Sequence, residues 1–423
     1  MTMEWYNQNI KKKGLKHMKK TLSLILALVI LLTASTACMA EKNPEGIIVP
    51  IITEMKRFDI PDNEAMRFIR ELKTGWNLGN TFDAADPGTW FHGSELDIES
   101  MWCGVKTSRD LIKAIKAAGF NLIRIPVSWH DHVDGSDSIS VDWMLRVKQV
   151  VGWCIDEGLY VIVNVHHDNK TGFLYPNPAN QKRSIEYMSS IWKQMAEAFN
   201  EYDEHVILES MNEPRMVDTQ YEWNWNKMSS DCRNSMKCIN ELNQIFVDTV
   251  RKTGGNNATR YLLVPSYDAS PNYAVNELFV LPKDTADNRI ILEAHAYTPY
   301  DFALNKGGYN TFDHTNAKYT TEIATFMNAL YNRYISRGIP VIIDEYGAMN
   351  KGGNLQDRVN FAAYFTASGS ARGMTCCWWD NHGFTGSGEL FGLIDRKTCE
   401  WKYPEIVEAI MKNCMYNREI SAE

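Results

Sequence analysis

The sequence predicts an α/β fold, a (β/α)₈ barrel (TIM barrel) with enlarged loops at the C-terminal ends of its strands. Short apolar runs alternate with longer segments of helical period from about Thr74 onward. Several of these runs, such as residues 161–163 and 341–343, are continuously apolar, which is typical of parallel strands buried on both faces. Eight runs with intervening helices across roughly 330 residues therefore favour a closed barrel.

The predicted strands share a short apolar run that ends in polar residues. They are residues 75–80, 121–127, 160–166, 206–213, 260–265, 289–297, 341–345 and 373–380. Pro340 directly precedes the seventh run, a position that a strand tolerates. The alternative fold is a doubly wound open sheet. It has less support, because no glycine-rich phosphate loop follows an early strand.

Amphipathic helices are expected between the strands. Residues 108–118 place Leu111, Ile112 and Ile115 on one face, and Gly119 is a suitable C-terminal stop. The same apolar period recurs over residues 184–199 and from Ile323 to Tyr334, and residues 405–412 predict a closing helix. No internal repeat or appended module is visible.

The chain divides into three parts. Residues 1–40 read as a signal peptide: Lys19 and Lys20 precede an apolar run at 22–32 and small residues at 33–40. Met18 is an alternative start, and Cys38 ends a sequence similar to a bacterial lipoprotein box, although Ser35 stands where leucine is usual. Residues 41–73 form an arm before the barrel, and residues 74–415 form the barrel domain. We therefore expect a secreted, periplasmic or cell-surface bacterial protein, with possible membrane attachment through a lipidated Cys38.

The protein is acidic, with a formal net charge of −8 for the 423 residues. Removal of residues 1–40, which hold six lysines and one glutamate, would leave −8 − 5 = −13. This balance argues against nucleic acid as a partner. The cysteines form no CxxC pair, which disfavours a structural zinc site. Cys232 and Cys238 are the nearest candidates for a disulfide, and buried free thiols are the alternative.

Active groups of such a barrel lie at the C-terminal ends of the strands. The residues at those ends are Asn80, Arg124, His166, Asn212, Glu213, His295, Tyr297, Glu345 and Trp379. Core packing explains this set poorly, because burying even one unpaired charge is costly.

Two of these residues are carboxylates. Taken singly, Glu213 could be a helix-start carboxylate before Pro214, and Glu345 a salt-bridge partner at a strand end. Taken together on one barrel rim, they suit cleavage of a glycosidic bond. One carboxylate attacks the anomeric carbon, while the other donates a proton to the leaving oxygen and later activates water.

Seven motifs follow one another in the order found in glycoside hydrolase family 5, which the sequence resembles from about residue 70 to 405. They are GWNLGN (75–80), IRIP (123–126), NVHH (164–167), MNEP (211–214), HAY (295–297), DEYG (344–347) and WWDN (378–381). A lone Asn-Glu-Pro would be modest evidence, whereas seven ordered motifs are highly specific. The motif forms are most similar to the branch that acts on β-1,4-glucans.

The resemblance implies a role for each catalytic residue. Glu213 matches the acid/base, Glu345 the nucleophile, and Asn212 the side chain that hydrogen-bonds the 2-hydroxyl of the sugar. Arg124 matches a residue whose fixed charge favours an ionised Glu345. The remaining supporting residues are the tyrosine that hydrogen-bonds the nucleophile, two histidines of the cleavage subsite and the aromatic platform under the sugar: Tyr297, His295, His166 and Trp379.

Some positions are ambiguous. Asn164 stands where the family often has aspartate. Of the adjacent pairs, we favour His166 over His167 and Trp379 over Trp378 as the residues facing the substrate. Glu209 is interpreted as a core hydrogen-bonding residue. Weaker substrate-binding candidates are Asn80, His167, Trp129, Asp380 and Asn381.

The predicted activity is endo-acting, retaining hydrolysis of cellulose, mixed-linkage β-glucan or xyloglucan. Aromatic residues that could line an open cleft are Trp90, Phe91, Trp102, Trp129, Trp223, Trp225, Tyr300 and Phe302. A β-mannanase of the same fold and a non-catalytic carbohydrate-binding protein are the alternatives. A zinc site at His166, His167 and Asp168, with His295 as a further ligand, lacks an evident complete ligand set. We therefore expect no metal, and we expect no cofactor. We also expect a monomer without a protein partner.

Overall fold

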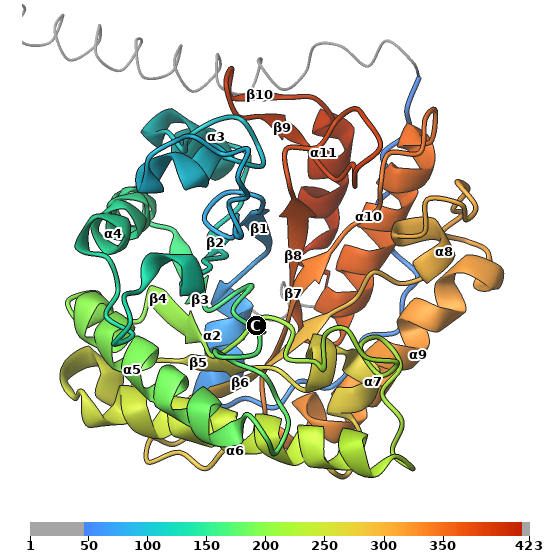
Figure 1. Cartoon of the computed structure of the whole chain (residues 1–423). Coiled ribbons are helices and arrows are strands. Elements are labelled where there is room, and N and C mark those ends of the chain that lie inside the picture. Colours follow the sequence, from blue (N-terminus) through green and yellow to red (C-terminus); the bar gives the residue numbers. More distant parts are fainter. Residues whose placement is uncertain (1–45, 417–423) are drawn as a thin grey trace, which may run out of the picture. The chain divides into compact units, whose positions relative to one another are not determined.

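The computed structural model describes residues 46–416, which contain a closed barrel of eight parallel strands (Figure 1). The strands are β1 (Gly75–Leu78), β2 (Leu122–Ile125), β3 (Tyr160–Asn164), β4 (Val206–Glu209), β5 (Leu262–Val264), β6 (Ile290–His295), β7 (Val341–Tyr346) and β8 (Thr375–Asp380). Each strand pairs with the next, and β1 pairs with β8. The predicted barrel is therefore confirmed, and the open sheet is excluded because it would leave β1 and β8 unpaired at its edges.

Helices surround the strands on the outside (Figure 1). The longer ones are α3 (Arg109–Ala117), α4 (Val141–Asp156), α5 (Gln181–Phe199), α6 (Ser230–Lys252), α9 (Ala317–Arg333), α10 (Leu355–Ala371) and α11 (Pro404–Asn413). Their ends follow from the sequence. For example, the Ser108 side chain accepts a hydrogen bond from the Leu111 backbone N–H at the start of α3, a standard N-cap. The four predicted helices are confirmed, each with slightly different bounds.

Shorter elements lie in the connections. They are helices α7 (Pro271–Ala274) and α8 (Tyr300–Ala303), the two-stranded ribbon of β9 (Ile394–Asp395) and β10 (Glu400–Trp401), and 3₁₀ turns at Glu95–Ser100, His130–His132, Gly255–Ala258, Tyr267–Ala269 and Ile335–Arg337. No helix within residues 46–416 is long and apolar enough to cross a membrane.

Helix α2 (Glu64–Glu71), in the predicted arm, closes the N-terminal end of the barrel. Its Phe68 ring stacks on Tyr261 at a centroid distance of 3.8 Å. The other buried residues of this cluster come from α2 and the barrel strands: Ala65, Ile69, Leu72, Leu122, Ile162, Ile207, Leu263, Ile291, Ile342 and Cys377. The barrel is thus filled by apolar side chains at this end, which leaves its C-terminal end for polar groups.

Strand β7 is irregular where it reaches the C-terminal rim. Ala294 of β6 pairs with Ile343, but the next residue, His295, pairs with Glu345. Asp344 is therefore an extra residue, a β-bulge, and bulges re-aim the side chains beside them. As a result both Asp344 and Glu345 reach Arg124 inside the barrel.

Cys232 and Cys238, the nearest candidates for a disulfide, form none, and the alternative of buried free thiols is confirmed for this pair. Both residues lie on helix α6, and both thiols are free. Six residues along a helix span about 9 Å, beyond the Cα separation that a disulfide can bridge. The Cys232 thiol instead accepts a hydrogen bond from the Asn226 backbone N–H.

Candidate active site

Both oxygens of Glu345 are held by hydrogen-bond donors. Arg124 Nη1 donates to Oε1 at 2.6 Å, and the Tyr297 hydroxyl donates to Oε2 at 2.7 Å. Burial and the adjacent Glu345 charge raise the pKa of Tyr297 well above its ordinary value, so the phenol keeps the proton that it donates. Glu345 is therefore a carboxylate fixed in one orientation at the end of β7.

Arg124, on β2, is fully buried and organises the floor of the site. Its Nε and Nη2 donate to the two oxygens of Glu209 on β4, each at 2.7 Å. The same Nη2 donates to Asn212 Oδ1 at 2.8 Å, so the amide NH₂ of Asn212 remains for another acceptor. Although burial opposes the charge, the surrounding carboxylates raise the pKa of Arg124 well above its ordinary value. Glu209 is thus a structural partner of Arg124, as predicted.

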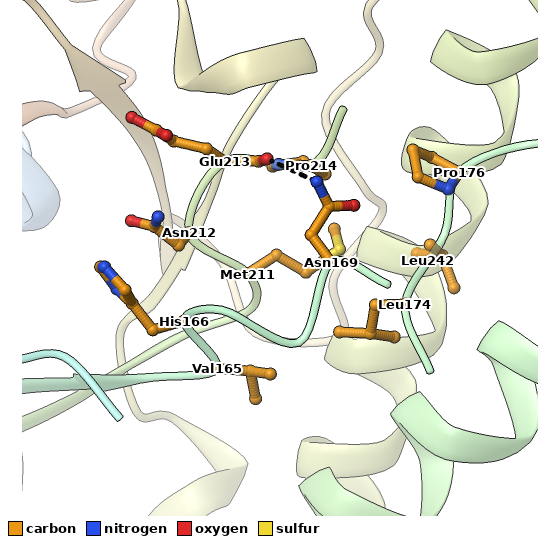
Figure 2. A pocket seen from close by; sticks show the side chains of 10 residues that line it. All are labelled: Val165, His166, Asn169, Leu174, Pro176, Met211, Asn212, Glu213, Pro214 and Leu242. Atoms are coloured by element: carbon orange, nitrogen blue, oxygen red, sulfur yellow. Dashed lines mark hydrogen bonds between the residues drawn. The ribbon is translucent and has the colours of Figure 1, made fainter. Parts of the chain in front are cut away.

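Glu213 follows β4, and two cationic groups contact its side chain. His295 Nδ1 lies 2.8 Å from Oε1, and Arg215 Nη1 lies 3.3 Å from Oε2. In Figure 2 the side chains of His166, Asn212 and Glu213 point to one side, away from the apolar side chains of Leu174 and Leu242. The polar and apolar side chains around this segment therefore lie on opposite sides.

Glu213 and Glu345 are close together. One carboxylate oxygen of each, and one ring nitrogen of His295, all lie within 4.8 Å of one another. Retaining glycosidases place the two carboxyl groups about 5–5.5 Å apart, whereas inverting enzymes leave about 6.5–9.5 Å for a water molecule. The separation therefore fits direct attack by one carboxylate and proton transfer by the other.

The protonation of the Glu213–His295 pair is asymmetric in the unliganded site. Burial opposes the charge on His295, but the Glu345 carboxylate and the hydrogen bond to Glu213 raise the pKa of the imidazole well above its ordinary value. Burial likewise favours neutral Glu213, yet His295 and then Arg215 lower the pKa of this carboxyl to about 2. The proton that the pair shares therefore resides on His295 at rest.

His166, the histidine favoured from the sequence, faces the same side as Asn212 and Glu213 (Figure 2). Asn164 Nδ2 lies 3.0 Å from His166 Nδ1 and donates to Glu209 Oε1 at 2.7 Å. Burial, His167 and Arg124 lower the pKa of His166 well below its ordinary value. The ring is therefore neutral with its proton on Nε2, which leaves an N–H for a ligand.

The tryptophan chosen from the sequence also lies at the site. Trp379 is parallel to the His166 ring, with a centroid distance of 6.0 Å. Trp378 is fully buried, and its Nε1 donates to the Phe391 carbonyl. Successive side chains of a strand point to opposite faces, so the Trp378 and Trp379 rings leave β8 in opposite directions.

Three of the weaker substrate-binding candidates are buried and make hydrogen bonds to neighbouring backbone groups. Trp129 is fully buried and its Nε1 donates to the Asn164 carbonyl. Asp380 is also fully buried and accepts hydrogen bonds from the Leu393 and Ile394 backbone N–H groups. Asn381 bonds the same loop through Gly383, Glu389 and Phe391.

The other two weaker candidates lie on the rim. Asn80 is half-buried in the turn after β1, where a φ of 56° and a hydrogen bond from its N–H to Asp83 fix the backbone. His167 is half-buried, and the half-exposed Trp102 ring lies 5.6 Å from it. Both remain accessible to a ligand.

The histidine-rich motif does not assemble as the metal alternative requires. Asp168 is fully buried, and its carboxylate accepts hydrogen bonds from the Trp129 N–H and the Tyr187 hydroxyl. His166 and His167 instead lie with Asp83, with one ligand atom of each within 4.8 Å of the others.

The sequence reasoning missed three residues of the site. Arg215 contacts Glu213 from two positions further along the chain. Glu293 and Asp344 lie beneath His295, at 3.4 and 3.6 Å from its Nε2. An acid inside the apolar run 290–294 was a signal for Glu293, because buried carboxyl groups are costly and seldom incidental.

A barrel with two carboxylates this close at its C-terminal rim defines the class of retaining glycoside hydrolases. Comparison with known proteins then gives the family: the sequence model described as "Cellulase (glycosyl hydrolase family 5)" matches residues 83–385. The chain belongs to glycosyl hydrolase family 5.

Individual relatives agree with this assignment. A solved structure of a GH5 family lichenase from Caldicellulosiruptor sp. F32 is 49% identical, with a TM-score of 0.85 over 87% of this chain and 100% of that one. Endoglucanase A from Ruminococcus albus is 38% identical over 84% of this chain and 94% of its own length. Endoglucanase A from Clostridium longisporum is 36% identical over 82% of this chain, which spans only 65% of that relative's length.

Proposed function

We propose that the chain is an endo-acting, retaining β-1,4-glucanase, with Glu345 as nucleophile and Glu213 as acid/base. The observation that carries the proposal is the pair of carboxylates within 4.8 Å, one held by Arg124 and Tyr297 and the other bonded to a proton-carrying histidine. The names of the relatives, endoglucanase and lichenase, support a β-glucan as the substrate.

The reaction has two displacements. In the first, a Glu345 oxygen bonds to the anomeric carbon, the glycosidic C–O bond breaks, and Glu213 gives a proton to the leaving oxygen. In the second, Glu213 takes a proton from water, the water oxygen bonds to the same carbon, and Glu345 leaves. One water is consumed, and the anomeric configuration is retained.

Proton release is coupled to the first displacement. The charge of Glu345, 3.6 Å from His295 Nδ1, favours the imidazolium. When Glu345 forms its covalent bond this charge disappears, so the shared proton moves toward Glu213 as the leaving oxygen needs it. Asn212, with its NH₂ group free of Arg124, is placed to donate to the sugar 2-hydroxyl.

Two substitutions test these roles. Glu345→Ala should abolish turnover of every substrate. Glu213→Ala should lower kcat/KM on polymer by about 10²- to 10⁴-fold but spare an aryl cellobioside whose leaving group needs no proton. Glu277→Ala, an exposed carboxylate, is the matched control. Equal losses on both substrates for Glu213→Ala would contradict its role as acid.

The preferred polysaccharide substrate is tested in a separate experiment. Reducing-sugar release from carboxymethyl-cellulose, mixed-linkage β-glucan and xyloglucan should exceed release from mannan under the same conditions. Faster cleavage of mannan would overturn the β-glucan proposal, and tight binding without turnover of any polymer would favour a binding protein.

We also propose that the protein is exported and monomeric. The signal-peptide prediction, including Met18 and Cys38, lies outside the described residues and rests on the sequence alone. Fractionation of cells into membrane, periplasm and medium, with Cys38→Ala as control, tests export and lipidation, and light scattering tests the oligomeric state.

A further inference from the structure

A cluster of buried acids lies directly beneath the acid/base. His295 contacts Glu213 through Nδ1, and its other ring nitrogen, Nε2, lies 3.4 Å from Glu293 Oε1 and 3.6 Å from Asp344 Oδ1. Glu293 and Asp344 are both 0% exposed. The imidazole therefore separates the reacting carboxylate from two acids that no substrate can reach.

The backbone explains why two acids meet here. Glu293 and His295 are two residues apart on β6, so their side chains lie on the same face of the strand. Asp344 is the extra residue of the β7 bulge, which lets it and Glu345 both reach Arg124 inside the barrel. A regular strand would turn one of these two neighbours out of the barrel.

The two acids lack the hydrogen bonds that buried carboxyl groups normally have. Within residues 46–416, no oxygen of either side chain accepts a well-formed hydrogen bond, and neither does His295 Nε2 donate one. The nearest donors are His295 Nε2 to both acids and Arg124 Nε, 3.3 Å from Asp344 Oδ2. Unpaired buried carboxyl groups are destabilising, so their placement around one nitrogen calls for a role.

We propose that Glu293 and Asp344 are positioning residues for the acid/base, which act by accepting the Nε2–H of His295 and so confine the exchangeable proton of the ring to Nδ1, facing Glu213. The inference rests on the proposed function and deepens it. It parallels the way a buried carboxylate fixes the tautomer of a catalytic histidine in hydrolases.

The protons balance in both states of the pair. At rest the imidazolium carries hydrogen on both nitrogens, and Nδ1–H donates to the Glu213 carboxylate. When the Nδ1 proton moves to Glu213 Oε1, the neutral ring keeps Nε2–H, and its Nδ1 lone pair accepts the new O–H. Without the two acids, the neutral ring could keep Nδ1–H instead, and Glu213 would then receive no proton.

Other titratable or charged groups surround His295 and determine its electrostatic environment. They are Arg124 from β2, His166 after β3, Glu209, Glu213 and Arg215 from β4 and its loop, Asp268 after β5, Glu293 from β6, Tyr297 after β6, and Asp344 and Glu345 from β7. Burial and the neighbouring carboxylates raise the pKa values of Glu293 and Asp344 well above ordinary. The two acids are therefore protonated more readily than ordinary carboxyl groups, and each still accepts the Nε2–H through its carbonyl oxygen.

The first test compares two substrates in the Glu293→Leu and Glu293→Gln variants of the full chain. On polymer, kcat/KM should fall by about 10- to 100-fold, part of the factor that general acid catalysis contributes. On an aryl cellobioside whose leaving group needs no proton, kcat/KM should stay within about threefold of the unsubstituted enzyme. The alkaline limb of the polymer pH profile should move to lower pH, because losing the carboxyl group that accepts the Nε2–H weakens proton retention by the pair.

Ile291→Val, a buried change two residues earlier on β6, should affect neither substrate nor the pH profile. Equal losses on both substrates with an unmoved pH profile would mean that Glu293 is only structural. A polymer rate that depends on added divalent cation and is lost with a chelator would assign the cluster to a metal instead.

A second test measures the protonation of His295 in the enzyme with Glu293 and Asp344 intact. In the full chain labelled with ¹⁵N-histidine, with His295→Gln used only for assignment, Nε2 of His295 should remain protonated across the pH range while Nδ1 loses its proton. A neutral ring protonated on Nδ1 would overturn the proposal. Either failure leaves the Glu213→Ala and Glu345→Ala results unaffected, so the inference and the proposed function fail separately.

Discussion

Glu345 differs from an ordinary strand-end carboxylate because each of its oxygens has a separate donor from a separate strand segment. Arg124 supplies a permanent charge from β2, and Tyr297 supplies a neutral hydroxyl after β6. A nucleophile held at both oxygens keeps its orientation while water and sugar exchange beside it, and orientation of this kind is a large part of catalysis.

Removal of the Tyr297 hydroxyl should therefore lower the catalytic rate more than the stability of the fold. Tyr297→Phe keeps the ring that packs near Phe391 and removes only the hydrogen bond to Glu345. Hydrogen bonds to charged groups contribute about 1.5–3 kcal/mol, so we expect kcat/KM to fall by about 10- to 100-fold with little change in Tm. An unchanged kcat/KM would show that the hydroxyl does not orient the nucleophile.

The Glu213–His295 pair makes stability depend on pH. The raised pKa of His295 contributes stability that is complete below its unfolded value of about 6.5 and is lost as the pH rises through the folded value. The lowered pKa of Glu213 contributes stability present above its unfolded value of about 4.3 and lost as the pH falls toward about 2.

His295→Gln should accordingly destabilise the protein most between about pH 4.3 and 6.5, by about 1–3 kcal/mol, and less at pH 9 or pH 3. Urea unfolding of both proteins at pH 3, 5.5 and 9 measures the difference. A cost that is the same at all three pH values would mean that the ring packs without carrying charge.

At the scale of elements, regular patterns were predictable from the sequence and irregular ones were not. Strands and helices can be predicted from the spacing of apolar residues, because burial of one or both faces of an element determines that spacing. The bulge at Asp344 leaves no such trace, since residues 341–346 form one strand and the extra residue is visible only against the register of β6. The two buried acids beneath His295 depend on that register.

Helix α2 also shows what the sequence leaves open, because residues 41–73 could be read only as an arm. Phe68→Ala should remove the stacking on Tyr261 and destabilise the protein by about 3–5 kcal/mol, the usual cost of truncating a buried phenylalanine. Below its Tm the variant should keep kcat/KM, because α2 packs at the end of the barrel opposite the active site. Arg67→Ala, an exposed change on the same helix, is the control. Lost activity in a folded Phe68→Ala variant would contradict this separation.

At the scale of the whole molecule, the barrel concentrates chemistry on one rim, and the loops decide which rim residues meet the substrate. The motifs predicted Glu213, Glu345, Arg124 and their supporting residues. They could not separate these from Trp129, Asp380 and Asn381, because a polar or aromatic side chain at a strand end can serve a ligand or fasten a loop. Only the packing of the long loops distinguishes the two uses.

The same distinction applies to the cleft aromatics. Phe302 is fully buried and Trp225 nearly so, whereas Trp90, Trp102, Trp223 and Tyr300 are exposed on loops after strands. Trp223 lies over the Arg215 guanidinium at 4.1 Å, and Arg215 contacts Glu213. Among the cleft aromatics, the exposed Trp223 ring is therefore the one to test for stacking on a sugar near Glu213.

Trp223→Ala should raise KM for polymer by about 2- to 10-fold, the range of one aromatic stacking contact, with a smaller change in kcat. Leu145→Ala, an equally exposed apolar residue on the outer helix α4, should leave both constants unchanged. An unchanged KM in Trp223→Ala would remove this ring from the substrate path.

If Glu345 attacks and Glu213 delivers the proton, hydrolysis proceeds by a double displacement. Time-resolved ¹H NMR of a short β-1,4-glucan during hydrolysis measures the anomeric configuration of the first product. The β-anomer should appear first and convert slowly to the equilibrium mixture. Initial release of the α-anomer would mean a single displacement by water, and the roles assigned to the two glutamates would be wrong.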